Sequence, residues 1–275
     1  MPDTHGGNIF KFSHDHKINL SEVTDFSANI NLLGPSPKGL EALNERLRYI
    51  SHYPDVTNDD VMNTIVDVYG IEKDSILLGN GAAELLYAVG RLSGFTGAFV
   101  PAPVFSEYQA SMDAANIPVR EIFYRQRQND DGTPYFEVPY LALQTFAAEL
   151  KGQDGRIIVF LGNPNNPDGT LLDKQSIKVL AQMLKDANSL LVIDESFIDF
   201  IGNESLRDNS HSMRELINQY DNVIIVHSFT KFYAVPGLRI GAAFANPTLI
   251  QELHQYIPAW SVNTFMTLGS AARVF

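Results

Sequence analysis

The sequence contains no cysteine, so neither a disulfide framework nor a thiolate metal site is available to it. Basic residues are also scarce, because 20 Lys and Arg stand against 32 Asp and Glu and give a formal net charge of −12. This balance argues against nucleic acid as a main partner, since duplex binding depends on basic surfaces. No apolar run is long enough to span a membrane, and residues 1–17 lack the apolar core of a signal peptide. We therefore expect a cytoplasmic protein that binds neither nucleic acid nor membrane.

The composition is that of a globular protein, with 45% hydrophobic and 19% charged residues over 275 positions. This length allows one large domain, or one large and one small domain. From residue 75 onward, short apolar runs alternate with segments of helical period. The runs predicted as buried strands are 75–79, 97–102, 119–124, 156–162, 189–195, 222–228 and 238–245. This alternation predicts an α/β fold with a mainly parallel sheet that helices cover on both faces.

Helical period is found in most of the intervals between these strands. The predicted helices are 82–92, 104–115, 139–150, 173–188 and 211–219, preceded by 36–50 and 59–69. Ser36 can cap the first of the two early helices, on which Leu40, Leu43, Leu47 and Ile50 share one face, and Gly70 ends the second. We expect residues 1–35 to form an irregular arm and 125–136 a loop or hairpin. Residues 261–275 have helical spacing but no end signal, which indicates a helix that is cut off.

In an open parallel sheet, ligands bind beyond the carboxyl ends of the strands. The strand at 75–79 runs into Gly81, Ala82 and Ala83, small residues at a helix start that suit an anion, although an ordinary turn would look the same. Phe105 follows the next strand and can stack on a flat ligand or simply join the core. The strand at 156–162 runs into "NPNNPDG", where prolines stiffen a loop that offers Asn side chains, among them Asn166.

Two later strands end on ionisable groups. Asp194 lies at the end of the apolar part of the run 189–195, and a lone aspartate at that place is usually a helix cap. Lys231 lies in the apolar stretch "HSFTKFYAVPGLRIG", which either lets the side chain reach solvent or depresses its pKa and makes it a nucleophile. Ser228, Thr230 and Arg239 lie beside it. Together with the strand ends above, this set is what pyridoxal 5′-phosphate requires: a lysine for the Schiff base, an aspartate that keeps the pyridine nitrogen protonated, and a phosphate cradle.

With these residues in this order, the sequence resembles the fold-type I pyridoxal-phosphate enzymes of the aminotransferase class I/II superfamily. The motifs that carry the resemblance are "NPNNPDG", "VIDESFIDF" and "SFTKFYAVPGLRIG", and it extends from about residue 5 to the end. Two branches compete, histidinol-phosphate aminotransferase and threonine-phosphate decarboxylase of cobalamin synthesis. "HGGN", "DFSANINLLG", "DESFIDF" and "PAWSVN" resemble the decarboxylase more.

The resemblance implies decarboxylation of L-threonine O-3-phosphate, a small phosphorylated amino acid, to (R)-1-aminopropan-2-yl phosphate. A histidinol-phosphate or related amino acid aminotransferase is the alternative. A catalytically impaired binding protein with the same fold is the second alternative. Phe197 favours the decarboxylase, because aminotransferases of this group usually carry at that position a Tyr whose hydroxyl bonds the ring 3′-oxygen, and Phe cannot donate that bond.

The resemblance also implies a role for each site residue. Lys231 would form the Schiff base, Asp194 would pair with the pyridine nitrogen, Asn166 with the ring 3′-oxygen, and Phe105 would stack on the ring. The phosphate would be held by Gly81, Ala82, Ala83, Ser228, Thr230 and Arg239. Tyr53 would reach the cofactor phosphate of a partner subunit, which implies a homodimer. The substrate would lie against His5, Gly6, Asn29 and Asn166. We assign no metal, because the histidines have no supported ligand spacing.

By the same resemblance, residues 1–47 form an N-terminal arm and part of a small domain, 48–247 the large cofactor-binding domain, and 248–275 the start of the C-terminal small-domain segment. Members of the superfamily normally continue beyond this point, and the further stretch carries an arginine that binds the substrate carboxylate. We therefore expect the small domain to be incomplete in this chain.

Overall fold

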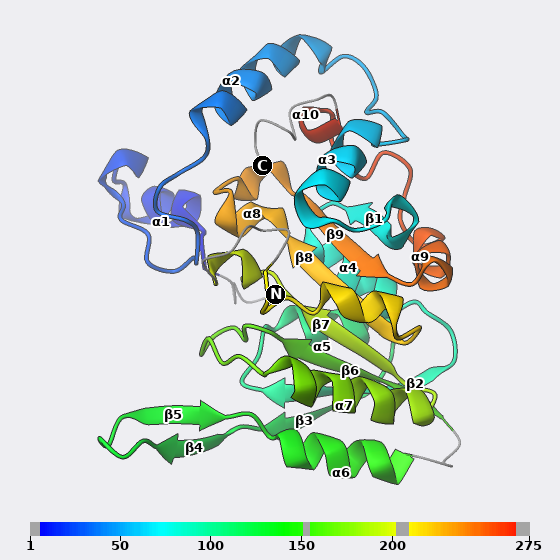
Figure 1. The fold of residues 1–275 in the computed structure, drawn as a ribbon. Coiled ribbons are helices and arrows are strands. Elements are labelled where there is room, and N and C mark those ends of the chain that lie inside the picture. The colour runs from blue at the N-terminus through cyan, green and yellow to red at the C-terminus, as the bar shows by residue number, and fades with distance from the viewer. Residues whose placement is uncertain (1–5, 151–154, 202–208, 268–275) are drawn as a thin grey trace.

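The computed structural model describes residues 6–150, 155–201 and 209–267, and Figure 1 shows their arrangement. One sheet has the strand order β1-β9-β8-β7-β6-β2-β3. Its strands are β1 (Ile76–Gly79), β2 (Phe95–Ala102), β3 (Val119–Phe123), β6 (Arg156–Gly162), β7 (Leu190–Asp194), β8 (Val223–Ser228) and β9 (Gly241–Ala245). Each strand predicted from an apolar run is therefore confirmed, with ends that differ by a few residues. The prediction of a hairpin at 125–136 is also confirmed, by β4 (Arg125–Gln128) and β5 (Pro134–Glu137).

The strand directions bring several chain segments to one edge of the sheet. β2 pairs in parallel with β3 and β6, and the parallel pairing continues from β6 to β7 and from β7 to β8. β9 is antiparallel to both β8 and β1. Because β9 alone is reversed among these strands, its beginning lies at the edge where the others end. The prediction of a mainly parallel sheet is therefore confirmed. A residue just before β9 lies at the same edge of the sheet as residues that follow the other strands.

The α-helices are α1 (Ile9–His16), α2 (Pro37–Arg46), α3 (Asp59–Tyr69), α4 (Ala82–Val89), α5 (Glu107–Ala114), α6 (Tyr140–Leu150), α7 (Lys174–Asp186), α8 (Phe229–Phe232), α9 (Pro247–His254) and α10 (Thr264–Thr267). The 3-10 turns are η1 (Leu20–Glu22), η2 (Leu47–Tyr49), η3 (Lys73–Ser75), η4 (Ile198–Phe200), η6 (Arg214–Asn218) and η7 (Pro236–Leu238). α3, α6 and α7 pack against one face of the sheet, and α4, α5 and α9 against the other (Figure 1). Coverage of both faces is therefore confirmed.

α7 shows how the sequence produces this layering. Asp173 caps the helix, because its carboxylate accepts a hydrogen bond from the backbone N–H of Ser176 at 2.9 Å. Ile177, Leu180 and Leu184 then recur at the spacing of one helix face, and all are fully buried against the sheet. Burial of each such side chain contributes about 1.5–3 kcal/mol.

Two of the predictions outside the sheet were wrong in part, and a third lies largely outside the described residues. Residues 1–35 are not wholly irregular, because Asn8 caps α1 and a capping box formed by Asn19 and Glu22 starts η1. These are local signals, and α1 buries no side chain, so packing against the core does not define it. The segment predicted as a helix at 211–219 contains only the 3-10 turn η6. Of the helix predicted at 261–275, the structure describes α10, and residues 268–275 lie outside the described part.

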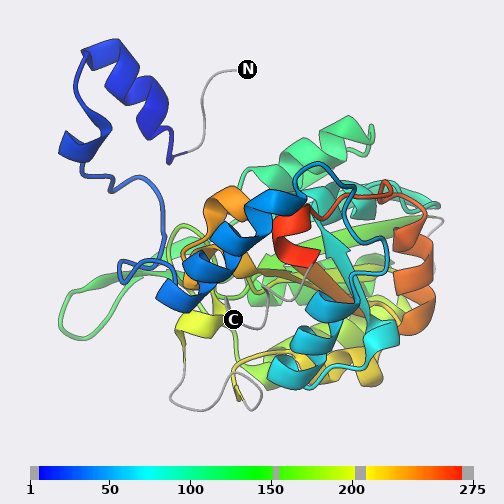
Figure 2. The same ribbon diagram turned by 90° about the horizontal axis from the view of Figure 1, so that it is seen from above.

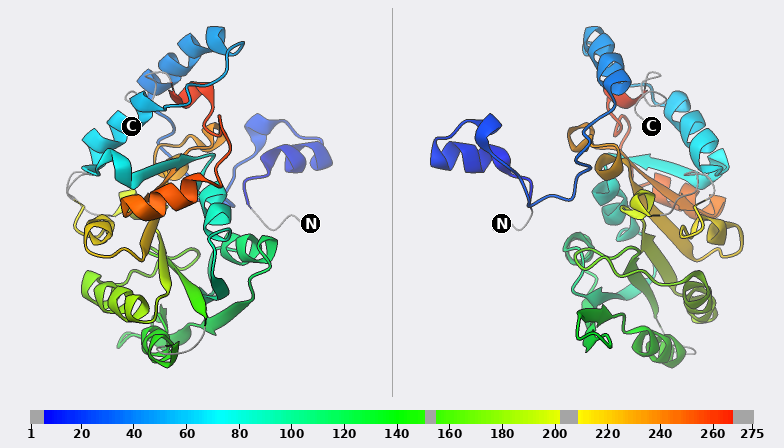
Figure 3. Two further views of the ribbon diagram at one scale, coloured as in Figure 1. Left: turned by 90° about the vertical axis from the view of Figure 1, so that its right-hand side faces the viewer. Right: turned by 60° about the vertical axis from the view of Figure 1, so that its left-hand side comes forward.

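The segment before α2 projects from the body of the molecule (Figures 2 and 3). Phe26, Leu32 and Leu33 in it are more than nine-tenths exposed. The predicted helix 36–50 is confirmed as α2 followed by η2, and Ser36 caps it as expected. Leu40 and Leu47 on its expected apolar face are nevertheless half exposed. This end of the molecule therefore has apolar surface that the described residues do not cover.

Candidate active site

A cavity of about 670 Å³ opens at the edge of the sheet where β6, β7 and β8 end. The predicted site residues that line it are Gly6, Asn29, Ala83, Phe105, Asn166, Asp194, Phe197, Lys231 and Arg239. The structure therefore brings the lysine, the aspartate, the asparagine and the aromatic ring around one space. His5, predicted at the substrate, lies outside the described residues.

Behind this cavity, Gly81, Ala82 and Arg239 are packed tightly together. Gly81 has φ +81° and ψ 165°, and a Cβ built on it would lie 2.9 Å from Arg239 Cζ. A Cβ on Gly241 would lie 2.6 Å from the backbone nitrogen of Ala82. Glycine is therefore required at both positions for the start of α4 to approach Arg239 and β9. The N–H groups at the start of a helix and a guanidinium beside them form a binding place for an anion.

Two hydroxyl groups lie close by, on the turn that follows β8. Ser228 Oγ lies 2.8 Å from Thr230 Oγ1, and both side chains are buried. Ser228 pairs with Gly241 across β8 and β9, which places the hydroxyls next to the glycine-lined approach described above. Gly81, Ala82, Ser228 and Thr230 do not line the cavity themselves but stand beside Arg239, which does.

Asp194 ends β7 and is almost completely buried. Its Oδ1 accepts a hydrogen bond from the backbone N–H of Ser196 at 2.9 Å. Its Oδ2 accepts one from the hydroxyl of Tyr108 at 2.8 Å. Neither donor carries a charge, and the carboxylate lines the cavity. The sequence reasoning missed Tyr108, although it follows the predicted stacking ring Phe105 by one helical turn.

Lys231 lies on α8, directly after β8, and is partly buried. Burial and the nearby Arg239 lower the pKa of its amine, and the carboxylate of Asp194 acts in the opposite direction. A lowered pKa leaves more of the amine uncharged at neutral pH, which is the nucleophilic form. Of the two interpretations left open for the "HSFTKFYAVPGLRIG" stretch, the structure supports the depressed pKa.

The N-terminal segment is fastened to the same turn. The backbone N–H of Asn31 donates to the carbonyl of Lys231 at 3.1 Å, and its Nδ2 donates to the carbonyl of Phe232 at 2.8 Å. These bonds across the fold explain why Gly6 and Asn29 reach the cavity although they are far from Lys231 in sequence.

In the loop "NPNNPDG", the three asparagine side chains differ in their hydrogen bonds and in their exposure. Asn163 Oδ1 accepts from the backbone N–H of Leu172 at 2.8 Å, and Asn165 Nδ2 donates to the carbonyl of Pro103 at 3.0 Å. Both are buried and hold the loop in place, whereas the partly exposed Asn166 lines the cavity. One amide thus faces the cavity, and the other two support the loop.

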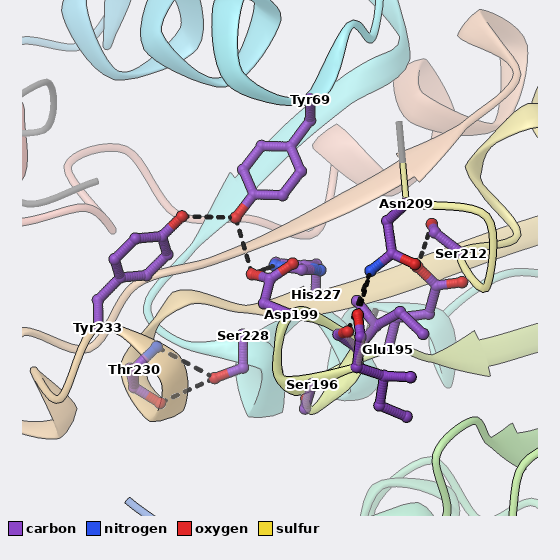
Figure 4. Close-up of polar contacts among 12 residues, drawn as sticks. Tyr69, Glu195, Ser196, Asp199, Asn209, Ser212, His227, Ser228, Thr230 and Tyr233 are labelled. Carbon is purple, nitrogen blue, oxygen red and sulfur yellow. Dashed lines mark hydrogen bonds and ion pairs between the residues drawn. The ribbon is translucent and has the colours of Figure 1, made fainter. Parts of the chain in front are cut away.

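A second buried polar cluster, shown in Figure 4, lies behind the lysine turn. The Tyr69 hydroxyl donates to Asp199 Oδ2 at 2.8 Å and lies 2.9 Å from the Tyr233 hydroxyl. His227 Nε2 lies 3.0 Å from the same Asp199 oxygen. Because His227 and Tyr233 precede and follow Lys231, this cluster braces the turn that carries it. Burial acts to raise the pKa of the Asp199 carboxyl, but His227 and Tyr69 outweigh it and the pKa is lowered. The sequence reasoning had no signal for this cluster.

Tyr53 is the predicted site residue that the structure places away from the cavity. Its ring is 80% exposed. It stacks on Trp260 with ring centroids 4.6 Å apart. Its role at a partner's cofactor remains a prediction.

In residues 6–150, 155–201 and 209–267, no three His, Asp or Glu side chains are grouped so that they could hold a metal ion. Over the same ranges, every helix is too short or too polar to cross a membrane.

The comparisons with known proteins agree on one protein family. The profile of the aminotransferase class I and II family matches residues 21–274. The adenosylcobalamin biosynthesis bifunctional protein CobDQ of Leptospira interrogans is 36% identical over 264 residues, which cover 94% of this chain and 28% of that protein. A putative threonine-phosphate decarboxylase of Caldanaerobacter subterraneus is 33% identical, and the match covers 96% of this chain and 65% of that protein. The chain thus spans less than two thirds of the length of either relative.

Among solved structures, the histidinol-phosphate aminotransferase of Clostridium acetobutylicum has a TM-score of 0.75 at 25% sequence identity. The match covers 92% of this chain and 69% of that one. The sheet and the two helix layers therefore belong to a fold that is shared with an enzyme of known structure.

Proposed function

The chain belongs to the aminotransferase class I and II family, and on that premise we propose that it serves in the pyridoxal-phosphate-dependent decarboxylation of L-threonine O-3-phosphate. The product of this reaction is (R)-1-aminopropan-2-yl phosphate, and the reaction is a step in cobalamin biosynthesis. The observation that carries the proposal is the pair of relatives at 36% and 33% identity, one named for adenosylcobalamin biosynthesis and one for threonine-phosphate decarboxylation.

The residues at the cavity fit the cofactor. The start of α4, the hydroxyls of Ser228 and Thr230, and Arg239 form a cradle in which glycine is sterically required, and this suits a phosphate. Phe105 offers a ring face, Asp194 a buried carboxylate and Asn166 an amide. When bound at Lys231, the cofactor withdraws electrons from the substrate α-carbon and weakens the bond there that stands perpendicular to its ring.

The protein side chains supply the rest of the chemistry. The lowered pKa of Lys231 leaves more of its amine uncharged, and this amine would hold the cofactor through the cofactor's carbonyl group. Asp194, whose carboxylate is fixed by two hydrogen bonds, would face the ring nitrogen. Arg239 balances the phosphate charge.

The choice of reaction rests with the side chains that hold the substrate. Side chains that held the substrate carboxylate at the weakened bond would favour loss of carbon dioxide, and side chains that held the α-hydrogen there would favour transamination. Phe197 at the cavity wall has no hydroxyl to offer the ring oxygen, which supports decarboxylation. The fold similarity to a histidinol-phosphate aminotransferase supports the alternative, transfer of an amino group from histidinol phosphate.

We also propose a homodimer. Phe26, Leu32 and Leu33 present apolar side chains on the projecting segment, and large exposed apolar surface marks a protein interface. The exposed Tyr53 is then available to a second copy. Within this proposal, residues 48–247 form the cofactor-binding domain, and 1–47 and 248–275 contribute to a smaller one.

The function is tested by product analysis. The protein is loaded with pyridoxal phosphate and given L-threonine O-3-phosphate, and ³¹P NMR follows the phosphate ester while released carbon dioxide is trapped. A parallel reaction contains histidinol phosphate and 2-oxoglutarate, and Lys231→Ala is the control for both. We expect carbon dioxide and aminopropanyl phosphate from the first reaction alone. Amino transfer in the second without carbon dioxide in the first would identify the aminotransferase instead.

A further inference from the structure

Tyr108 has no assigned role, yet it touches two groups of the candidate site. It lies on α5 and is completely buried. Its hydroxyl donates to Asp194 Oδ2 at 2.8 Å, although 86 residues separate the two in sequence. Its ring meets that of Phe105 edge-on, with centroids 5.9 Å apart and an interplanar angle of 87°. One side chain therefore contacts both the predicted stacking ring and the predicted partner of the ring nitrogen.

The position of Tyr108 is fixed from the other side as well. Its ring stacks on Phe160 of β6, with centroids 5.1 Å apart and planes inclined by only 10°. Such a stacked ring in a packed core has little freedom to turn. The hydroxyl therefore points at one oxygen of Asp194 while the backbone of Ser196 holds the other.

The protonation state of the Tyr108 hydroxyl is defined as well. Burial, followed by the neighbouring charge of Asp194, raises the pKa of Tyr108 well above its ordinary value, so it remains a protonated donor. A hydrogen bond donated to a carboxylate stabilises the charged form and makes the carboxylate a weaker base. A weaker base opposite the ring nitrogen leaves the shared proton on that nitrogen.

We propose that Tyr108 is a positioning residue that orients the Asp194 carboxylate through the hydrogen bond to Oδ2, so that the proton between Asp194 and the cofactor stays on the ring nitrogen. This inference rests on the proposed cofactor but not on the choice between decarboxylation and transamination. It assigns to the hydroxyl a part in the reaction that a phenylalanine ring with the same packing would lack.

The test is Tyr108→Phe, which keeps the ring and removes the hydroxyl. Tyr124→Phe is the matched control, because Tyr124 is also buried and its hydroxyl has no hydrogen-bond partner among the described residues. Both variants and the parent are loaded with pyridoxal phosphate labelled with ¹⁵N in the ring, whose resonance reports protonation of that nitrogen. Loss of a hydrogen bond to a charged group changes the partition of the proton between ring nitrogen and carboxylate by roughly 10–100-fold.

We expect the resonance of Tyr108→Phe to move toward the unprotonated position, and that of Tyr124→Phe to coincide with the parent. An unchanged resonance in Tyr108→Phe would limit Tyr108 to packing and overturn the proposal. If the unsubstituted protein binds no pyridoxal phosphate, the proposed function is wrong, and this inference is wrong with it.

A second measurement avoids dependence on the folding of the variant. 3-Fluorotyrosine is placed at position 108, or as a control at 140, whose hydroxyl donates to the carbonyl of Ser176 at 2.8 Å. We expect the ¹⁹F resonance at 108 to move when pyridoxal phosphate binds, and that at 140 to stay. Equal responses at the two positions would contradict a link between Tyr108 and the cofactor.

Discussion

Gly81→Ala tests whether the start of α4 and Arg239 form one anion-binding cradle. Gly81 has φ +81° and ψ 165°, a region that side chains other than glycine enter at a cost of about 1–3 kcal/mol. The new methyl group would also meet the Arg239 guanidinium, whose Cζ lies 2.9 Å from the built Cβ. That contact forces the guanidinium away from any phosphate held at the start of α4. Loss of a charge-assisted hydrogen bond costs about 1.5–3 kcal/mol, which corresponds to roughly 10–100-fold weaker binding of pyridoxal phosphate.

The matched control is Gly132→Ala in the β4–β5 hairpin. Gly132 has φ +83°, but nothing lies within 4 Å of a Cβ built there. Both variants are expected to lose stability through backbone strain, and thermal unfolding without cofactor measures that loss. Only Gly81→Ala is expected to lose affinity, which a titration followed by visible absorbance measures. If the folded Gly81→Ala protein binds pyridoxal phosphate as tightly as Gly132→Ala does, the cradle does not hold the phosphate and the reasoning is refuted.

Further predictions concern the lysine, the buried cluster behind it and the exposed surface. Lys231→Ala should abolish the visible absorbance band of bound pyridoxal phosphate, and a band that survives would place the attachment elsewhere. Asp199→Asn should lower the stability at pH 7 by about 1–3 kcal/mol in urea unfolding, since it weakens the bonds to Tyr69 and His227. The pKa of Asp199 is lowered from 3.8 in the folded protein, so its carboxylate stabilises the fold above pH 3.8 and this stabilisation is lost as the pH falls through the folded-state pKa. The free energy of unfolding of Asp199→Asn should therefore fall less steeply with decreasing pH than that of the unsubstituted protein. Equal slopes for the two proteins would contradict this. Leu32→Ser with Leu33→Ser should shift the mass in light scattering from dimer to monomer, and an unchanged mass would remove this segment from the interface.

Much of the architecture was readable from the order of residues. Buried strands in parallel sheets are continuous apolar runs, so the strands of the main sheet stand out one by one, and residues such as Ile158 and Val192 are indeed fully buried. Helices with a buried face, such as α7, show it through their period. α1 was missed because it buries no side chain and starts at a local cap, the side chain of Asn8. At 211–219, Leu216 and Ile217 are buried as a helix face would require, but the backbone forms only the 3-10 turn η6.

The chemical types at the site were also visible in the sequence, because they follow strands whose ends must meet. Asp194 ends a strand, and Lys231, Asn166 and Phe105 come shortly after one, and parallel strands deliver such residues to one edge. Arg239 joins them for a different reason, since it precedes β9, and only the reversed direction of that strand brings its start to the same edge.

The supports of these residues were decided by the tertiary structure alone. Tyr108 reaches Asp194 across 86 residues, and His227 reaches Asp199 across 28, through side-chain directions that no periodicity encodes. A pattern of apolar and polar residues predicts which elements form and which of their ends meet, because burial acts on whole faces. A hydrogen bond needs two atoms within about 3 Å and in line. That condition is met only after every strand register and rotamer has been set by the packing of the complete fold.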